Sequence, residues 1–228
     1  MTASAHWEEE VRSRMESLCK TGTPFLLGVT GGVATGKTTV ARMLEELGAP
    51  IMDFDVLSRL VVEPGKQAWR EIVDYFGEQV LLKDKTLNRK RLSEIIFEDA
   101  EKRKKLESFI HPKLGEEFAN LVTGYASRDP NVIIQVVVPL LLEVNMQHLF
   151  HKLLLVYIPE QMQIERLVKR DGVSQEMAAK MLASQWPIEE KRGYADFIVD
   201  NSGSLEQTRG QVEKIWEELK KVQKEAIS

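Results

Sequence analysis

Residues 31–38 have the spacing of a phosphate-binding loop, G-x-x-x-x-G-K-[ST], and match it at every fixed position. Gly31 and Gly36 permit backbone angles that let successive N–H groups point into one concavity at the start of a helix. Lys37 would reach the β- and γ-phosphates, and the Thr38 hydroxyl would bind Mg²⁺. The pattern therefore predicts an ATP site with Mg²⁺ as cofactor. The candidate ATP-binding residues are Gly31, Gly32, Val33, Ala34, Thr35, Gly36, Lys37, Thr38 and Thr39.

Two carboxylates, Asp53 and Asp55, follow a short apolar segment. In a parallel sheet, ligands bind beyond the carboxyl ends of the strands, so these carboxylates and the phosphate loop should face one crevice. A carboxylate in that place can orient an acceptor hydroxyl and take its proton during phosphoryl transfer. The alternative role is to cap the following helix, and it suits one of the two residues. We assign the catalytic role to Asp55.

Arg166 and Arg170 are four residues apart and share one face of a predicted helix, with Lys169 beside them. Composition alone would favour a solvated charged surface. However, the pair follows the fourth predicted strand, at the start of a predicted lid. This position favours a role for Arg166 in neutralising the transferring phosphate.

The elements that must hold these residues alternate between apolar runs and helical patterns, which is typical of α/β proteins. We predict a P-loop kinase-like parallel five-stranded sheet flanked by helices. The helices are expected at 37–47 and 204–222, the latter opened by a capping box of Ser204 and Gln207. The strands are expected at 25–30, 50–53, 131–138, 153–158 and 197–199.

The long interval between the second and third predicted strands has a mostly helical pattern and exceeds what one crossover helix needs. We interpret it as an inserted helical subdomain that binds the substrate. A strand-free charged segment after the fourth strand fits a mobile lid. The leading helix carries an apolar stripe of Trp7, Val11, Met15 and Leu18, which favours docking on the core over a partner site. The predicted parts are a helical extension (1–23), a nucleotide-binding core (24–56, 126–162 and 193–228), the inserted subdomain (57–125) and the lid (163–192).

The chain has 228 residues, of which 43% are hydrophobic and 29% charged, the balance of a globular protein. Its formal charge of -4 argues against a global basic field for nucleic acid, so local Lys and Arg must hold any anionic substrate. No apolar run approaches the roughly 20 residues needed to span a membrane. The single cysteine, Cys19, allows no intrachain disulfide and favours a reducing cytoplasm. We expect a monomer or weak homo-oligomer.

Beyond the phosphate loop, an ordered series of motifs across about residues 25–203 resembles the dephospho-CoA kinases, enzymes of the last step of coenzyme A synthesis. The series is more discriminating than the loop alone, which many unrelated enzymes share. Its members are Asp53-x-Asp55, Arg59, Val61-Val62-x-Pro64-Gly65, Phe76-Gly77, Leu87-Asn88-Arg89, Leu92, Phe97, Leu106-Glu107, His111-Pro112, Pro139-Leu140-Leu141-x-Glu143, Gln163-x-x-Arg166, Arg170, Gln185 and Ala195-Asp196-x-x-x-x-Asn201.

The resemblance implies that ATP phosphorylates the 3′-hydroxyl of the dephospho-CoA ribose, giving CoA and ADP. It makes Asp55 the general base, with Lys37 and Arg166 at the transferring phosphate. It also implies that Asn201 lies near the adenine of ATP, with Arg170 as a further ATP contact. Arg89 and His111 would hold the CoA-side substrate, although His111 before Pro112 could equally be a histidine satisfied within a helix break. Further candidate substrate contacts are Thr30, Arg59, Pro139 and Leu140.

Three positions depart from the family pattern. Ala34 stands where glycine is commoner, at a position that the general motif leaves free. Met181 stands where many members have an arginine, beside Lys180, which could replace the charge. The third predicted strand ends in Val136-Val137-Val138 without an aspartate, so Mg²⁺ would rely on Thr38, ATP oxygens, water and Asp55.

Three other functions fit the phosphate loop by itself. A different P-loop kinase, acting on a nucleotide, a nucleoside or a small alcohol, would share the loop but not the His111-Pro112 and Pro139-Leu140-Leu141 elements. A nucleotide-dependent switch would need the guanine-reading N-K-x-D motif or a D-x-x-G motif after the central strand, and the sequence has neither. A catalytically inactive binding protein would be expected to lack some of Lys37, Thr38, Asp55 and Arg166.

Overall fold

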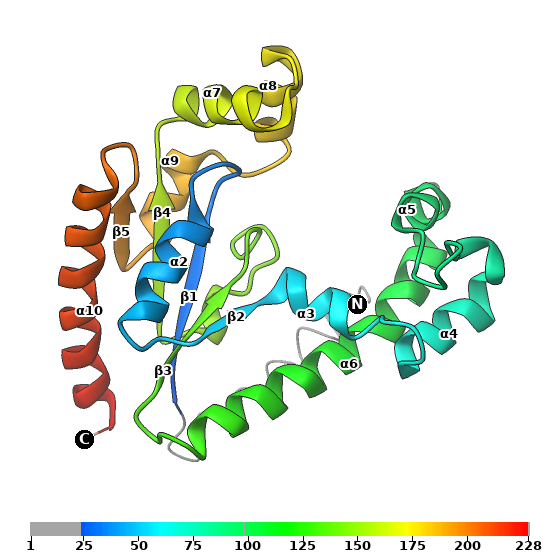
Figure 1. Cartoon of the computed structure of the whole chain (residues 1–228), viewed down its shortest axis with the longest axis horizontal. Coiled ribbons are helices and arrows are strands. Elements are labelled where there is room, and N and C mark those ends of the chain that lie inside the picture. Colours follow the sequence, from blue (N-terminus) through cyan, green and yellow to red (C-terminus); the bar gives the residue numbers. More distant parts are fainter. Residues whose placement is uncertain (1–23, 98, 228) are drawn as a thin grey trace. The chain divides into compact units, whose positions relative to one another are not determined.

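The computed structural model describes residues 24–97 and 99–227 (Figure 1). The predicted helical extension, residues 1–23, lies outside the described residues. The described chain divides into two compact units. One contains the described residues from 54 to 127, and the other contains residues 24–53 and 128–227.

The larger unit is built on a sheet of five parallel strands, with the order β2-β3-β1-β4-β5. The predicted five-stranded parallel sheet is therefore confirmed, and its strand ends lie within two residues of the expected ones. The strand β1 has the central place, with Val29 opposite Val137 on one side and Leu154 on the other. The strands are β1 (Phe25–Gly31), β2 (Ile51–Asp53), β3 (Ile133–Val137), β4 (Lys152–Tyr157) and β5 (Phe197–Asp200).

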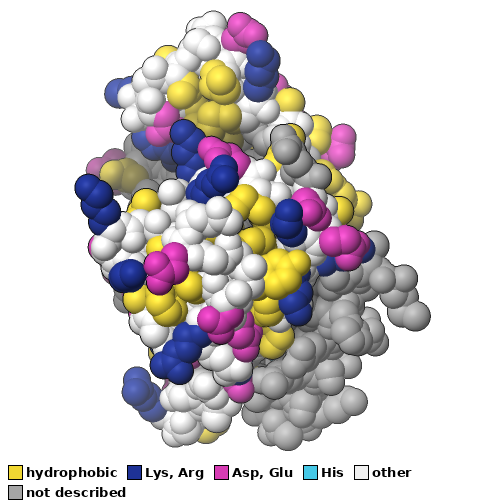
Figure 2. All heavy atoms as spheres, turned by 90° about the vertical axis from the view of Figure 1, so that its right-hand side faces the viewer, with side chains coloured by type: hydrophobic (Ala, Val, Ile, Leu, Met, Phe, Trp, Pro, Cys, Tyr) yellow, Lys and Arg dark blue, Asp and Glu magenta, His cyan; other side chains and the backbone are white. Residues whose placement is uncertain are grey.

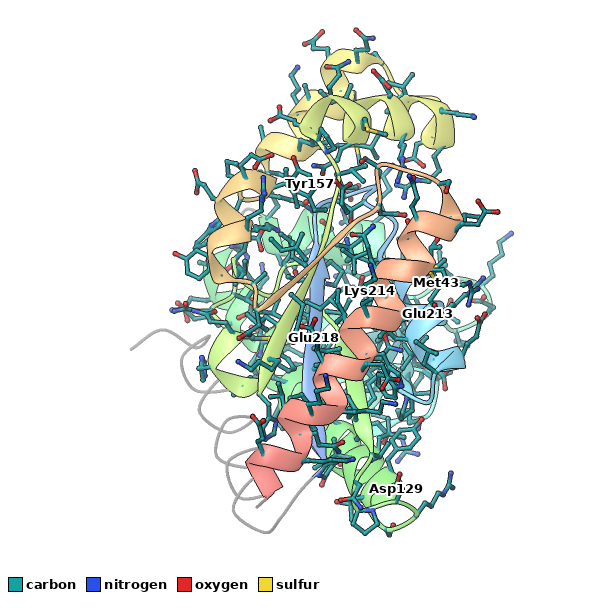
Figure 3. The ribbon with its side chains drawn as sticks, turned by 90° about the vertical axis from the view of Figure 1, so that its left-hand side faces the viewer. Met43, Asp129, Tyr157, Glu213, Lys214 and Glu218 are labelled. Carbon is teal, nitrogen blue, oxygen red and sulfur yellow. The ribbon has the colours of Figure 1, made fainter. Side chains whose placement is uncertain are left out.

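One face of this sheet is covered by α2 (Lys37–Glu46) and α10 (Leu205–Ile227), which lie beside one another in Figures 1 and 3. Alternate residues of the strands, such as Val29, pack there against Leu44 of α2 and Leu219 of α10. Every residue of β1 and of β3 is buried, as expected for central parallel strands.

A buried glutamine, Gln135 of β3, ties α2 to the sheet. Its side-chain amide donates to the carbonyl of Ala41, at 2.7 Å, and to that of Ala49, at 2.8 Å. Burying an amide is favourable only when its hydrogen bonds are made, and these two bonds hold both the helix and the turn after it. The predicted helix at 37–47 is confirmed with nearly the expected bounds.

The smaller unit is helical, and its core is a cluster of buried side chains that includes Val62, Ile72, Leu92 and Leu106. Phe54, at the start of the unit, packs its ring 5.4 Å from that of Phe118. The helices are α3 (Phe54–Leu60), α4 (Gln67–Phe76), α5 (Arg89–Phe97) and α6 (Ala100–Ala126), with a 3₁₀ turn, η1 (Glu78–Val80), between α4 and α5.

The longest helix, α6, begins after Asp99, whose carboxylate accepts hydrogen bonds from the amides of Glu101 and Lys102. It continues through Pro112 without interruption. The alternative that His111 sits in a helix break is therefore wrong. A proline removes one helical hydrogen bond, and the packing of Leu106 and Leu114 on either side outweighs that loss.

After β4 come the three helices of the predicted lid region, α7 (Glu160–Asp171), α8 (Gln175–Ala183) and α9 (Ile188–Lys191). The predicted capping box at the start of α10 is confirmed, because the Ser204 amide donates to Gln207 Oε1 and the Gln207 amide to Ser204 Oγ. α10 runs several residues beyond its predicted end. Among the described helices, none is both long enough and apolar enough to cross a membrane.

We predict that acid lowers the free energy of unfolding through His111. Burial lowers the pKa of His111 to about 4 from 6.5, so the unfolded chain binds the proton more readily than the folded one. Stability is therefore full above pH 6.5 and is lost as the pH falls towards 4. At pH 5 the loss is about 2 kcal/mol from this residue. Burial lowers the pKa of His151 as well, so it adds a loss of the same sign.

The measurement is the free energy of unfolding in urea at a series of pH values between 8 and 5. The variant His111→Gln should lose stability less steeply on acidification than the parent, and His151 accounts for part of the slope that remains. An unchanged slope in this variant would contradict the assignment of the acid sensitivity to His111.

Candidate functional site

The phosphate loop lies between β1 and α2, so that its backbone opens at the carboxyl edge of the sheet. Two of its glycines are required by close contacts. A Cβ on Gly31 would lie 2.5 Å from the carbonyl oxygen of Val156, and one on Gly36 would overlap the side-chain amide of Asn201. Gly36 also has a φ of 90°, in the left-handed region. The sequence pattern thus marks places where the sheet and the loop allow no side chain.

Ala34, the departure from the family pattern, also has a left-handed backbone, with a φ of 59°. For a residue with a Cβ this conformation costs roughly 1–2 kcal/mol. The motif requires no particular side chain at this position, but the backbone there must adopt the left-handed conformation. The chain tolerates the cost because the loop is held on both sides by the contacts described below.

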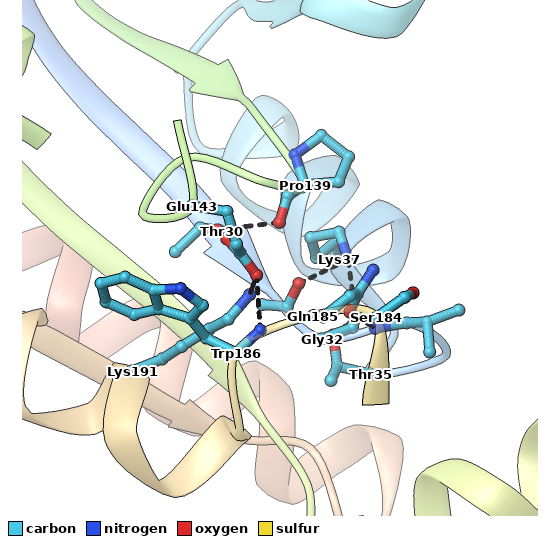
Figure 4. Close-up of polar contacts among 12 residues, drawn as sticks. Thr30, Gly32, Thr35, Lys37, Pro139, Glu143, Ser184, Gln185, Trp186 and Lys191 are labelled. Carbon is cyan, nitrogen blue, oxygen red and sulfur yellow. Dashed lines mark hydrogen bonds and ion pairs between the residues drawn. The ribbon is translucent and has the colours of Figure 1, made fainter. Parts of the chain in front are cut away.

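The loop presents unpaired backbone donors. Among the described residues, the amides of Ala34, Gly36 and Thr38 have no hydrogen-bond acceptor. They stand at the first turn of α2, where the helix dipole favours negative charge. The ammonium of Lys37 folds back over the loop and donates to the carbonyl oxygens of Gly31, at 3.0 Å, and Gly32, at 2.7 Å (Figure 4). The arrangement is suited to an anion with several phosphate oxygens.

Asn201, the residue that follows β5, is hydrogen-bonded to the phosphate loop. It is buried, and its side-chain amide donates to the carbonyl of Thr35 at 2.8 Å, while its Oδ1 accepts from the Thr208 hydroxyl at 2.9 Å. The Thr35 hydroxyl in turn donates to the Gly32 carbonyl at 2.9 Å. The side chain of Asn201 thus orients the loop. A contact of Asn201 with adenine stays a prediction.

The two lid arginines have different surroundings. Arg166 is partly buried and donates to the backbone carbonyl of Asn201 at 2.8 Å, with its other terminal nitrogen beside Gly36. Arg170 is exposed and pairs twice with the carboxylate of Asp171, at 2.7 and 2.8 Å. These bonds raise the pKa of Arg170 above its usual value. The structure therefore brings Arg166, but not the side chain of Arg170, to the loop.

Two of the predicted substrate contacts meet at the ends of β1 and β3. The Thr30 hydroxyl donates to the carbonyl of Pro139 at 3.3 Å, and the neighbouring Leu140 is 41% exposed (Figure 4). An apolar side chain that is exposed beside the phosphate loop suits contact with the organic part of a substrate.

The sequence motifs included three residues to which no role was assigned, and a fourth was missed entirely. The amide of Val33 donates to Gln185 Oε1 at 3.0 Å, and the buried Gln163 packs its side-chain oxygen against Gly32. Glu143 forms an ion pair of 2.6 Å with Lys191, which is fully buried. Motif spacing marked Glu143, Gln163 and Gln185, but no sequence pattern signals that a lysine on a charged segment is buried.

The helical unit holds the other candidates. Asp55 and Arg59 lie on α3, Arg89 begins α5, and His111 lies on α6. Burial lowers the pKa of Arg89 below its usual value, repulsion from Arg59 lowers it further, and attraction to Asp55 opposes both. These three side chains are therefore close enough to sense one another's charge. His111 is partly buried and does not line the cavities of this unit described next.

Two adjoining surface cavities of about 250 and 220 Å³ share Arg89, Val62 and Leu87. The first is polar at its mouth, with Arg59, Glu63 and Thr86. The second is lined mainly by apolar side chains, among them Leu92, Ile96, Leu106 and Ile110. Figure 2 shows Lys and Arg interspersed with Asp and Glu on the face it displays, so positive charge is placed locally rather than as a broad field.

Comparisons with known proteins identify the family of this chain. The family model of the dephospho-CoA kinases matches residues 25–207. A dephospho-CoA kinase from Syntrophus aciditrophicus is 46% identical over 200 residues, covering 88% of this chain and 85% of its own. One from Shouchella clausii is 42% identical over 186 residues, covering 82% of this chain and 94% of its own.

Two solved structures are similar to this chain in fold and in sequence. A Thermus thermophilus protein has a TM-score of 0.71 at 29% identity, covering 86% of this chain and 98% of its own. The dephospho-CoA kinase of Campylobacter jejuni has a TM-score of 0.64 at 30% identity, covering 87% of this chain and 98% of its own. The resemblance inferred from the sequence is therefore confirmed, and the chain belongs to the dephospho-CoA kinase family.

Proposed function

We propose that this protein transfers the γ-phosphoryl group of ATP to the 3′-hydroxyl of the dephospho-CoA ribose, giving CoA and ADP. The observation that carries the proposal is a complete, braced phosphate loop in a chain of this kinase family. We expect the enzyme to act in the cytoplasm, as a monomer or weak homo-oligomer.

The loop side of the site fits ATP. The unpaired amides at the start of α2 supply donors for phosphate oxygens, and Lys37 and Arg166 supply positive charge beside them. The described residues contain no group of three His, Cys, Asp or Glu side chains that could hold a metal. Mg²⁺ would bind through Thr38, whose side chain is exposed at the first turn of α2, with ATP oxygens and water as its other ligands. When bound, it neutralises charge on the β- and γ-phosphates.

The helical unit fits the acceptor. Dephospho-CoA carries a diphosphate and a long arm in which amides and a hydroxyl separate short alkyl segments. Arg59 and Arg89 at the polar cavity suit the diphosphate, and the adjoining apolar cavity suits the arm. Thr30, Pro139 and Leu140, at the edge of the sheet in the larger unit, stay candidate substrate contacts. His111, which lines neither cavity, would support the acceptor site through α6.

Asp55 is the general base of this proposal. Its carboxylate is exposed in the first turn of α3, and its backbone carbonyl accepts a hydrogen bond from the Ser58 hydroxyl. The 3′-hydroxyl would give its proton to this carboxylate as its oxygen bonds to the γ-phosphorus. The bond between that phosphorus and the oxygen of ADP breaks, and ADP leaves with the electron pair.

The acceptor is tested by a coupled assay of ADP release over a panel of alcohols. Turnover should be fast with dephospho-CoA and near background with AMP, adenosine and shikimate. The product should carry its new phosphate on the 3′-oxygen, which ³¹P NMR can establish. Equal turnover with another member of the panel would contradict the assignment.

The base is tested by Asp55→Asn, which keeps the shape of the side chain and removes its proton affinity. Turnover should fall by roughly 10² or more, the scale of general base catalysis, while the Kd for ATP stays near that of the parent. Asp74→Asn, at an exposed position on α4 of the same unit, is the matched control and should keep full turnover. Near-native turnover of Asp55→Asn would remove this residue from its role.

The acceptor cavity is tested by Arg89→Met, which keeps the length of the side chain and removes its charge. The KM for dephospho-CoA should rise about tenfold or more, because a charge-assisted hydrogen bond is lost, and the KM for ATP should not change. Lys90→Met removes the adjacent exposed cation and serves as the control. If both variants raised this KM equally, general electrostatic attraction would explain the effect and Arg89 would have no specific contact.

A further inference from the structure

We propose that Glu143, Lys191 and Gln185 are positioning residues for the phosphate loop. In this proposal a buried ion pair fixes the turn at residues 184–187, and Gln185 on that turn fixes the Val33 peptide of the loop. None of the three needs to touch the nucleotide. The inference rests on the loop being the ATP site, and it adds that the affinity for ATP is set partly by an anchor outside the loop.

The anchor is the ion pair of Glu143 and Lys191. Their charged atoms are 2.6 Å apart, with the lysine side chain fully buried and the glutamate 14% exposed. Removing one partner of such a pair leaves the other charge buried without compensation, which strongly disfavours the local structure. The pair therefore joins the segment after β3 to the end of α9.

The same carboxylate oxygen also holds the turn. Glu143 Oε1 accepts a hydrogen bond from the backbone N–H of Trp186 at 3.0 Å, and the same oxygen forms the ion pair with the ammonium of Lys191 (Figure 4). The amide of Gln185 donates to the carbonyl of Leu182 at 2.9 Å, so the turn is fixed to the end of α8 as well. Glu143 Oε1 and the Leu182 carbonyl together hold the turn that carries Gln185.

Gln185 connects this turn to the phosphate loop through a hydrogen bond. Its Oε1 accepts the amide of Val33 at 3.0 Å, and Gln163 packs against the preceding Gly32. Gln163 and Gln185 line the same cavity of about 240 Å³ between α7, α8 and the turn. The corner of the loop is held by both glutamines, directly before the strained Ala34.

The orientation of the Val33 peptide matters because Ala34, with its left-handed φ, comes next and the unpaired amides follow. A peptide free to rotate at Val33 would relax Ala34 to an ordinary conformation and turn those amides away from their common direction. Gln185 supplies the acceptor that opposes this rotation. Phosphate binding would then have to reorient the loop amides, and this ordering would weaken the affinity for ATP.

The test is Gln185→Leu, which keeps the approximate volume and removes the acceptor. Without nucleotide, amide hydrogen exchange at Val33, followed by NMR, should become at least about tenfold faster. The Kd for ATP should weaken about three- to tenfold, as expected for the loss of one hydrogen bond. The kcat at saturating ATP and the KM for dephospho-CoA should stay within about twofold of the parent, since a positioning residue for the loop touches neither reacting group. Gln175→Leu, at an exposed position on α8, is the control for all four measurements.

The anchor is tested by Glu143→Gln, Lys191→Met and the double variant. Each single variant leaves one buried charge and should weaken ATP binding and destabilise the protein. The double variant removes both charges, while Gln at position 143 can still accept the Trp186 amide. It should therefore bind ATP within about threefold of the parent. If Lys191→Met does not fold, Gln185→Leu still decides the question.

Val33 exchange and ATP affinity that both stay unchanged in Gln185→Leu would overturn the proposal. Faster exchange with unchanged affinity would also overturn it, because the contact would then have no consequence for the nucleotide. Failure of the parent to bind ATP at all would be a failure of the proposed function instead. The exchange comparison, made without nucleotide, would still report on the contact.

Discussion

A site that binds triphosphate must keep backbone N–H groups unpaired, and the fold normally pairs such groups. In this chain the conflict is resolved at the first turn of α2, where a helix has no intrahelical acceptors for its leading amides. Keeping these amides unpaired constrains the neighbouring residues. Gly31 and Gly36 can carry no side chain, Ala34 takes a left-handed backbone, and Asn201 is buried to hold the Thr35 carbonyl.

The second constraint is electrostatic. The chain is net negative, so it cannot attract phosphates through its overall charge and must place cations individually. Two of the cations at the loop contact neutral backbone acceptors. Lys37 donates to loop carbonyls and Arg166 to the Asn201 carbonyl, whereas Arg89 feels repulsion from Arg59 and attraction to Asp55. Arg170, which is neutralised by Asp171, shows the contrast. A backbone carbonyl orients a cation without cancelling its net charge, so that charge can still act on a ligand.

Much of this could be predicted from the sequence, because the signals are local. The phosphate loop is eight consecutive residues, and short apolar runs that are rich in β-branched residues indicate the strands. The contacts that orient the loop could not be predicted. Gln185 is 152 residues from Val33 and Asn201 is 166 residues from Thr35, and nothing near either residue encodes its partner. Lys191 carries the ordinary signature of a surface residue, and its burial follows only from the position of Glu143.

The place of β1 in the sheet has a consequence for how the chain folds during synthesis. β1 begins at residue 25, but its neighbours are β3 and β4, which end at residues 137 and 157. The asparagine that braces the loop comes later still, at position 201. During synthesis the phosphate loop therefore emerges from the ribosome early, whereas the strands and the asparagine that fix its conformation emerge later. ATP can stabilise the finished protein, but it cannot guide the early steps of its folding.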